Sequence, residues 1–99
     1  MDGKRVMRLL GRYHLTDFER KVLLRTFEIP KGETISYKQL AADCGRPLAY
    51  RAVGNIMHKN PLPIVIPCHR VVASNRKIGG YAYGIGMKRL LLRLEGAMV

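Results

Sequence analysis

The chain has 99 residues, of which 47% are hydrophobic and 25% charged. This composition predicts one small folded domain and excludes wholesale disorder. Eighteen Lys and Arg against seven Asp and Glu give a net charge of +11, which favours a polyanionic partner, nucleic acid before an anionic membrane surface. The alternative is a soluble or structural basic protein, which can have the same excess of Lys and Arg over Asp and Glu. No apolar run reaches a membrane span, and the charged start does not resemble a secretory signal, so we expect a cytoplasmic protein.

The chain begins with a basic segment, which we interpret as an N-terminal arm over 1–14 or a short helix, ahead of a domain over 15–99. Thr16 and Glu19 have the spacing of a capping box and predict the start of a helix, which Pro30 and Gly32 end. Its apolar residues near one face are Phe18, Val22 and Phe27.

A second capping box, at Ser36 and Gln39, predicts a short helix that stops at Gly45. Pro47 suits the first turn of the next helix. A short helix, a turn of about three residues and a helix with a basic face indicate a helix-turn-helix, although many helical pairs have this pattern without binding DNA. The core face expected for the second helix is Leu48, Ala52 and Ile56. Its polar face is Arg51, Asn55, His58 and Lys59.

After the prolines at 61 and 63, the apolar run Ile64-Val65-Ile66 fits a buried strand or extended segment, which Val71-Val72 extends. An amphipathic helix then closes the chain, with Gly96 just past its end. The apolar stripe expected on that helix is Met87, Leu90, Leu91 and Leu94. The predicted fold is mainly α with minor β, a single compact helix-turn-helix domain of winged-helix-like type.

Cys68 stands between Pro67 and the pair His69-Arg70. A thiol reacts as its thiolate, which neighbouring cationic groups favour, so Cys68 is a candidate nucleophile. In an extended segment His69 would point away from the thiol, and a bridging water or a bend at Pro67 would be needed. A small buried residue beside a surface pair is the alternative. Cys44 is interpreted as a buried small residue, and the scattered histidines predict no metal site.

The sequence Ile66-Pro67-Cys68-His69-Arg70-Val71 resembles the active-site motif of O6-alkylguanine-DNA alkyltransferases. Four further blocks resemble that family in the same order, at 35–41, 51–54, 59–64 and 94–96. The resemblance covers about 15–96 and corresponds to the C-terminal active-site domain of the family, whose members usually carry a larger domain ahead of it. It implies a DNA repair protein that moves the alkyl group of O6-alkylguanine in duplex DNA irreversibly onto its own cysteine, once per molecule and without a cofactor.

The resemblance also implies roles for individual residues. Cys68 would accept the alkyl group, and His69 would activate it through a water while Glu95 orients the histidine. Tyr37 would assist rotation of the damaged nucleotide and donate a proton to the departing guanine. Asn60 would brace the active-site turn.

Further residues would contact the substrate. Arg51 would take the place of the extruded base in the stack. The other implied DNA contacts are Tyr37, Ala52, Gly54, Asn55 and Arg70. The implied substrate pocket is Tyr81, Ala82, Pro63 and Met57. The expected state is a nucleoid-associated monomer on double-stranded DNA, without a metal or a membrane partner.

Two other functions fit part of the pattern. Alkyltransferase-like proteins bind the same damage without repairing it, but have another residue where this chain has Cys68. A helix-turn-helix regulator with an incidental thiol would prefer one DNA sequence and perform no reaction, and it leaves Tyr37, Asn60 and Glu95 unexplained.

Overall fold

The computed structural model describes residues 2–62, 64–73 and 84–97. Their Cα atoms have a radius of gyration of 12.5 Å. The elements in chain order are α1 (Gly3–Leu10), α2 (Asp17–Phe27), β1 (Ile35–Ser36), α3 (Tyr37–Asp43), α4 (Tyr50–His58), the 3₁₀ helix η1 (Cys68–Arg70), β2 (Val71–Val72) and α5 (Ile85–Leu94). The prediction of a mainly helical domain with minor β structure is confirmed. No helix in these described ranges has the length and apolar character to span a membrane.

The predicted capping box begins α2, and a Ser36 N-cap, one half of the second predicted box, begins α3. The Thr16 hydroxyl accepts from the Glu19 amide at 3.1 Å, and the Glu19 carboxylate accepts from the Thr16 amide at 2.8 Å. Ser36 accepts from the Gln39 amide at 3.0 Å in the same way. These bonds satisfy amide groups that a helix start leaves without partners, so each helix begins where the sequence predicts.

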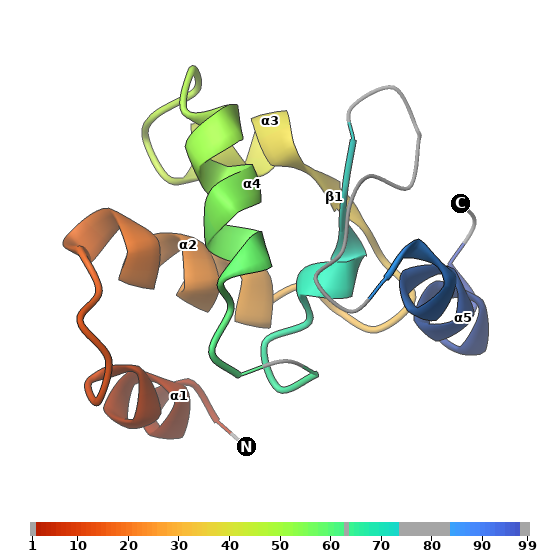
Figure 1. The fold of residues 1–99 in the computed structure, drawn as a ribbon, viewed down its shortest axis with the longest axis horizontal. Helices are drawn as coiled ribbons and strands as arrows, with labels where there is room; N and C mark the ends of the chain where they lie inside the picture. The colour runs from red at the N-terminus through yellow and green to blue at the C-terminus, as the bar shows by residue number, and fades with distance from the viewer. Residues whose placement is uncertain (1, 63, 74–83, 98–99) are drawn as a thin grey trace.

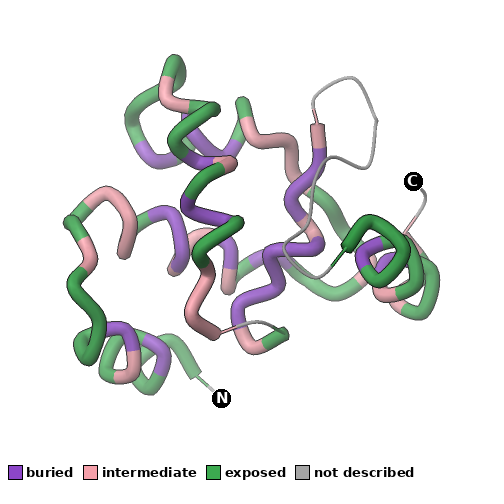
Figure 2. The backbone as a smooth tube through the Cα atoms, in the orientation of Figure 1, coloured by how far each residue is buried: buried purple, intermediate pink, exposed green. Residues whose placement is uncertain are grey.

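The helix-turn-helix consists of α3 and α4, which pack against each other and against α2 (Figure 1). The connection is longer than expected, because α4 begins at Tyr50 and Pro47 lies before it. The predicted core face of α4 was therefore partly wrong. Leu48 is 89% exposed and Ala52 is exposed, whereas Ile56 is buried as predicted. The face that enters the core is Val53, Ile56 and Met57, and the predicted polar face is exposed (Figure 2).

The first helix, α1, is part of the packed domain. Its N-cap Asp2 accepts from the Arg5 amide at 2.9 Å, and its Val6 and Leu10 are completely buried. Figure 1 shows α1 beside α2 and on the opposite side of the molecule from α5. The segment expected as a basic arm or short helix thus contributes apolar side chains to the core.

A short parallel pairing joins two distant parts of the chain. Ile35 of β1 pairs with Val71 of β2, and Ser36 pairs with Val72. Because β1 leads directly into α3 and β2 directly follows η1, the pairing sets the start of α3 beside the segment that carries Cys68. The apolar run was expected as a buried strand or extended segment. Ile64 and Val65 instead form a turn, in which Ile64 has a φ of 73° and is exposed, whereas Ile66 is a buried β-bridge residue.

The last helix, α5, packs against η1 with an unexpected face. Its buried residues are Lys88 and Leu92, whereas Met87, Leu90 and Leu94 of the predicted apolar stripe are exposed. The predicted helix is present, but the side that faces the domain was wrong. Gly96, with a φ of 78°, follows the helix end as predicted.

Candidate active site

A tight turn holds Cys68. Its amide donates to the Ile66 carbonyl at 2.8 Å, and Pro67 between them has φ −79° and ψ 67°, the dihedrals of an inverse γ-turn. The Arg70 amide donates to the Pro67 carbonyl at 2.9 Å and closes the 3₁₀ turn. The bend at Pro67, one of the two ways in which His69 could act on the thiol, is present. Cys68 is 3% exposed. The thiol is thereby held on a hydrogen-bonded and almost completely buried turn.

Asn60 fixes the chain ahead of that turn. Its side-chain amide nitrogen donates to the Ile66 carbonyl at 2.8 Å, and its side-chain oxygen accepts from the Leu62 amide at 2.9 Å. The Ile66 carbonyl therefore accepts from both Asn60 and Cys68. Asn60 has the contacts that a bracing residue needs, although its role in a reaction stays a prediction.

The buried His69 and the partly buried Glu95 form a pair. His69 Nε2 lies 2.9 Å from Glu95 Oε1, and His69 is 2% exposed. Glu95 is the C-cap of α5, where the Ala97 amide donates to the Leu92 carbonyl at 2.9 Å and turns the chain back. Burial lowers the pKa of His69, against the hydrogen bond to Glu95, which raises it. The lowered pKa favours the neutral imidazole, which can accept a proton.

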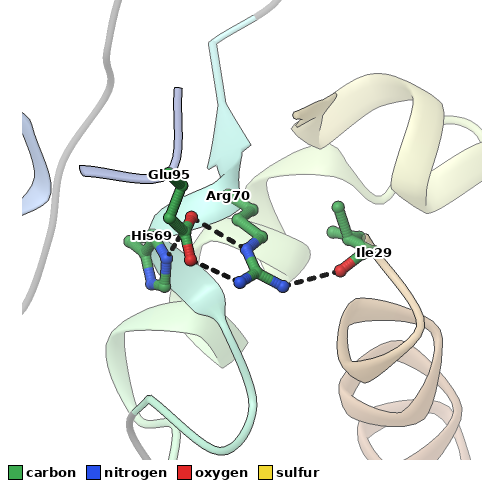
Figure 3. Close-up of polar contacts among 4 residues, drawn as sticks. All are labelled: Ile29, His69, Arg70 and Glu95. Carbon is green, nitrogen blue, oxygen red and sulfur yellow. Dashed lines mark hydrogen bonds and ion pairs between the residues drawn. The ribbon is translucent and has the colours of Figure 1, made fainter. Parts of the chain in front are cut away.

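Arg70 holds the other side of the Glu95 carboxylate (Figure 3). Its Nε donates to Glu95 Oε1 at 3.0 Å, and a second nitrogen contacts Oε2, which makes the pair bidentate. Its third nitrogen donates to the Ile29 carbonyl at 2.7 Å, just past the end of α2. The Arg70 hydrogen bonds hold the pKa of the Glu95 carboxyl below its ordinary value. The guanidinium of Arg70 thus bonds within the protein, and the expected DNA contact of Arg70 stays a prediction.

Tyr37 and Lys88 are electrostatic neighbours of Cys68. Tyr37 is half-buried at the start of α3, and burial, followed by the nearby Cys68 sulfur, raises the pKa of its phenol. Lys88 is completely buried, and its Nζ donates to the Val71 carbonyl at 2.7 Å and lies 3.5 Å from the Tyr37 hydroxyl. The pairing of β1 with β2 and the packing of α5 bring these groups together.

The predicted DNA contacts on α4 lie on its outer side. Arg51, Ala52 and Asn55 are exposed, and Gly54 is partly buried. Their contacts with DNA stay predictions. Of the predicted pocket residues, Met57 is buried in the core, where its sulfur accepts from the Thr26 hydroxyl at 3.8 Å, and its place in a substrate pocket stays a prediction. The other three, Pro63, Tyr81 and Ala82, lie outside the described residues.

Sequence reasoning missed Lys88 and the engagement of Arg70 with Glu95. The signal for Lys88 was its spacing, because Lys88, Leu92 and Glu95 stand at i, i+4 and i+7 and share one helix face. No group of three His, Cys, Asp or Glu side chains that could hold a metal ion is found in the part of the chain that the structure describes.

Comparison with known proteins places these residues in a family. Residues 17–97 match the family model described as 6-O-methylguanine DNA methyltransferase, DNA binding domain. The chain belongs to this family. A methylated-DNA–protein-cysteine methyltransferase of Methanosarcina barkeri is 51% identical over 80 residues, which are 81% of this chain and 51% of that protein. The chain thus spans about half the length of that curated relative.

Solved structures of similar proteins have the same fold. The Mycobacterium tuberculosis OGT, crystallised in complex with DNA, matches with a TM-score of 0.81 and 46% identity over 84% of this chain and 52% of that one. The S. pombe protein Atl1, in complex with damaged DNA containing O6-carboxymethylguanine, matches with a TM-score of 0.72 and 31% identity. That match covers 85% of this chain and 80% of the S. pombe chain. The methyltransferase match over 17–97 includes the residues of the candidate site.

Proposed function

We propose that this domain carries an active site as well as a DNA-binding surface, and that it moves the alkyl group of O6-alkylguanine in duplex DNA onto Cys68. The observation that supports this most strongly is the Pro67 turn, which holds a buried thiol next to the buried His69 and its partner Glu95. A nucleophile, a neutral base and an anion that orients the base are the groups that nucleophilic substitution at carbon requires.

The chemistry balances with the residues of the site. His69 takes the proton of the Cys68 thiol through a water, and Glu95 stabilises the imidazolium that forms. The sulfur then bonds to the alkyl carbon while the bond between that carbon and O6 breaks, and its electron pair passes to the guanine. A ring nitrogen of the guanine takes the proton of the Tyr37 hydroxyl, and the proton held by His69 restores the phenol. The thioether is stable, so each molecule acts once.

The exposed face of α4 is proposed as the DNA contact. This face includes Arg51 near the start of the helix. The net charge of +11 attracts the phosphate backbone of DNA. A base inside the duplex cannot reach a buried thiol, so the damaged nucleotide must rotate out, at a cost of a few kcal/mol. Arg51 would fill the space that the rotated base leaves in the stack.

We also propose that the protein acts as a cytoplasmic, nucleoid-associated monomer.

The test is a duplex with one labelled O6-methylguanine, mixed with the wild-type chain, Cys68→Ala and Cys44→Ala. Cys44 is the matched control because it is also a buried free thiol. We expect label on the wild type and on Cys44→Ala, and none on Cys68→Ala. Label on Cys68→Ala would contradict the proposal. Tight binding of the damaged duplex without any transfer by the wild type would instead favour a damage-recognition protein, like the S. pombe neighbour.

A further inference from the structure

The start of α4 exposes apolar surface that the core does not use. The connection from α3 and the first residues of α4 are exposed at every position from 45 to 52 except Ala49, which is partly buried (Figure 2). Leu48 is 89% exposed there, and Tyr50 is 36% exposed. Neither side chain belongs to the hydrophobic core cluster, so packing inside the domain does not explain a leucine and a tyrosine at these positions.

The Tyr50 ring is held in place by the neighbouring helix. The Lys38 ammonium of α3 lies over the ring, 5.5 Å from its centre, and forms a cation–π contact between the two helices of the helix-turn-helix. Both side chains are exposed, so the contact orders the ring at the surface without burying it. A ring that is already ordered loses less conformational freedom when a flat partner stacks on it.

The charges around the ring favour a nucleic acid as that partner. Lys38 and Arg51, which follows Tyr50 on α4, are exposed cations. The acidic residue of α3, Asp43, is paired with Arg25 at 3.4 Å. An exposed aromatic ring beside cations is the arrangement on which nucleic acids bind, because a base stacks on the ring while phosphates contact the positive charges.

We propose that Tyr50 is a further DNA-contacting residue beside Arg51, whose ring packs against a base that loses its stacking neighbour when the damaged nucleotide rotates out. This inference rests on the proposed function. Rotation of one nucleotide unstacks the bases that adjoin it, which makes the extruded state costly. An aromatic side chain placed against such a base restores part of the lost stacking. Tyr50 thereby stabilises the extruded state, and Lys38 holds the ring in position.

The binding test uses a duplex with one abasic site, which lacks a base in the stack as the duplex with a rotated nucleotide does, and the same duplex intact. We expect Tyr50→Ala to bind the abasic duplex about tenfold more weakly than the wild type, the scale of one base stacked on an aromatic side chain. Its affinity for the intact duplex should change much less. Tyr50→Phe keeps the ring and should bind both duplexes as the wild type does.

The control variant is Tyr13→Ala, which removes a tyrosine that is 45% exposed between α1 and α2. Equal affinities of Tyr50→Ala and Tyr13→Ala for the abasic duplex would overturn the proposal, and so would equal losses by Tyr50→Ala on the abasic and intact duplexes. Binding to the abasic duplex requires no alkyl transfer. A wild type that shows the expected dependence on Tyr50 but transfers no methyl group would therefore overturn the proposed transfer and not the role of Tyr50.

Transfer rates give a second readout, which a merely structural role would not produce. Tyr50→Ala should slow methyl transfer from duplex DNA and leave transfer from free O6-methylguanine unchanged, because the free base needs no extrusion. Slower transfer from both substrates would mean that Tyr50 supports the fold of the site, which contradicts the proposal.

A double-mutant cycle tests the part assigned to Lys38. If Lys38 acts by holding the ring, Lys38→Met should weaken binding to the abasic duplex much less in the Tyr50→Ala background than in the wild type. Effects of the two substitutions that multiply independently would contradict this part of the proposal and would indicate that Lys38 contacts DNA by itself.

Discussion

His69 Nε2 and Glu95 Oε1 lie 2.9 Å apart, although 26 positions separate the two residues in the chain. The contact exists because the C-cap of α5 returns to the 3₁₀ turn that carries Cys68. A carboxylate at a helix C-terminus is disfavoured by the helix dipole, so its place there needs another cause. Its bonds to His69 and Arg70 supply that cause.

Glu95→Gln tests the His69–Glu95 pair. The amide keeps the shape of the carboxylate but loses its charge, so the imidazolium that forms after proton transfer loses its counter-ion. We expect alkyl transfer to slow about tenfold or more, with DNA affinity unchanged. Glu33→Gln, at an exposed position, is the control. A pH–rate profile for Glu95→Gln that overlays the wild type would remove Glu95 from the mechanism.

The pH dependence of the same pair has a definite sign. The pKa of His69 is lowered by burial, so the folded chain binds a proton there less readily than the unfolded chain does. The free energy of unfolding contributed by His69 is therefore lost as pH falls below the ordinary histidine value of about 6.5. We therefore expect the free energy of unfolding of His69→Gln, measured with urea from pH 5 to 7, to fall less at low pH than that of the wild type. An unchanged pH slope in the variant would mean that His69 is not the group responsible.

Arg51→Ala tests the outer face of α4. If Arg51 fills the space of the extruded base, its loss should slow transfer from duplex DNA much more than transfer from free O6-methylguanine, which needs no extrusion. Arg93→Ala removes an exposed arginine from α5 and serves as the control. Equal losses on the duplex and the free base would mean that Arg51 does not act in the extruded state.

Gly54→Ala separates DNA approach from packing. A Cβ at Gly54 would meet no atom within 4 Å, so nothing inside the protein requires glycine in the middle of α4. The variant should be more stable by about 0.5–1 kcal/mol, because alanine favours a helix. It should nevertheless bind DNA more weakly if the backbone approaches the duplex. Gly86→Ala, on α5 and equally open, should leave DNA affinity unchanged. Equal affinities for the two variants would contradict a contact at Gly54.

The local signals in the sequence predicted more than the long-range ones. Capping boxes depend on residues three positions apart, so the starts of α2 and α3 were predicted correctly. The inner face of α5 depends on what the helix packs against, which spacing alone does not state. Leu90 and Leu94 therefore looked like core, and Lys88 went unnoticed.

The candidate site was predicted as a set of residues, not as an arrangement. The family motif identified Cys68, His69 and Glu95, but the bidentate bond between Arg70 and Glu95 is a contact across 25 positions. Nothing in the local sequence shows such a contact. The requirement for glycine at position 32 is also not visible in the local sequence. It comes from a φ of 88° and from the Glu95 carbonyl oxygen, which would lie 3.1 Å from a Cβ at this position.

Lys88 also has a measurable effect on stability. Burial lowers the pKa of Lys88 to about 8 from 10.5, so between these values the folded chain binds fewer protons than the unfolded chain. Stability contributed by this group therefore rises with pH across that window and is lowest below pH 8. Relative to Lys88→Met, the wild type should gain on the order of 2 kcal/mol between pH 8 and 10.5 in denaturant unfolding. Parallel curves for the two proteins would show that Lys88 is not perturbed by its surroundings.

The central claim is that Cys68 accepts one alkyl group and is not regenerated. Intact-mass measurement after incubation with excess duplex containing O6-methylguanine tests it directly, with peptide mapping to locate the added group. The account predicts a mass increase of one methyl group per chain, on Cys68, with Cys44 unmodified and no further consumption of damaged duplex. An unchanged mass, a methyl group on Cys44, or continued consumption of the duplex would contradict it.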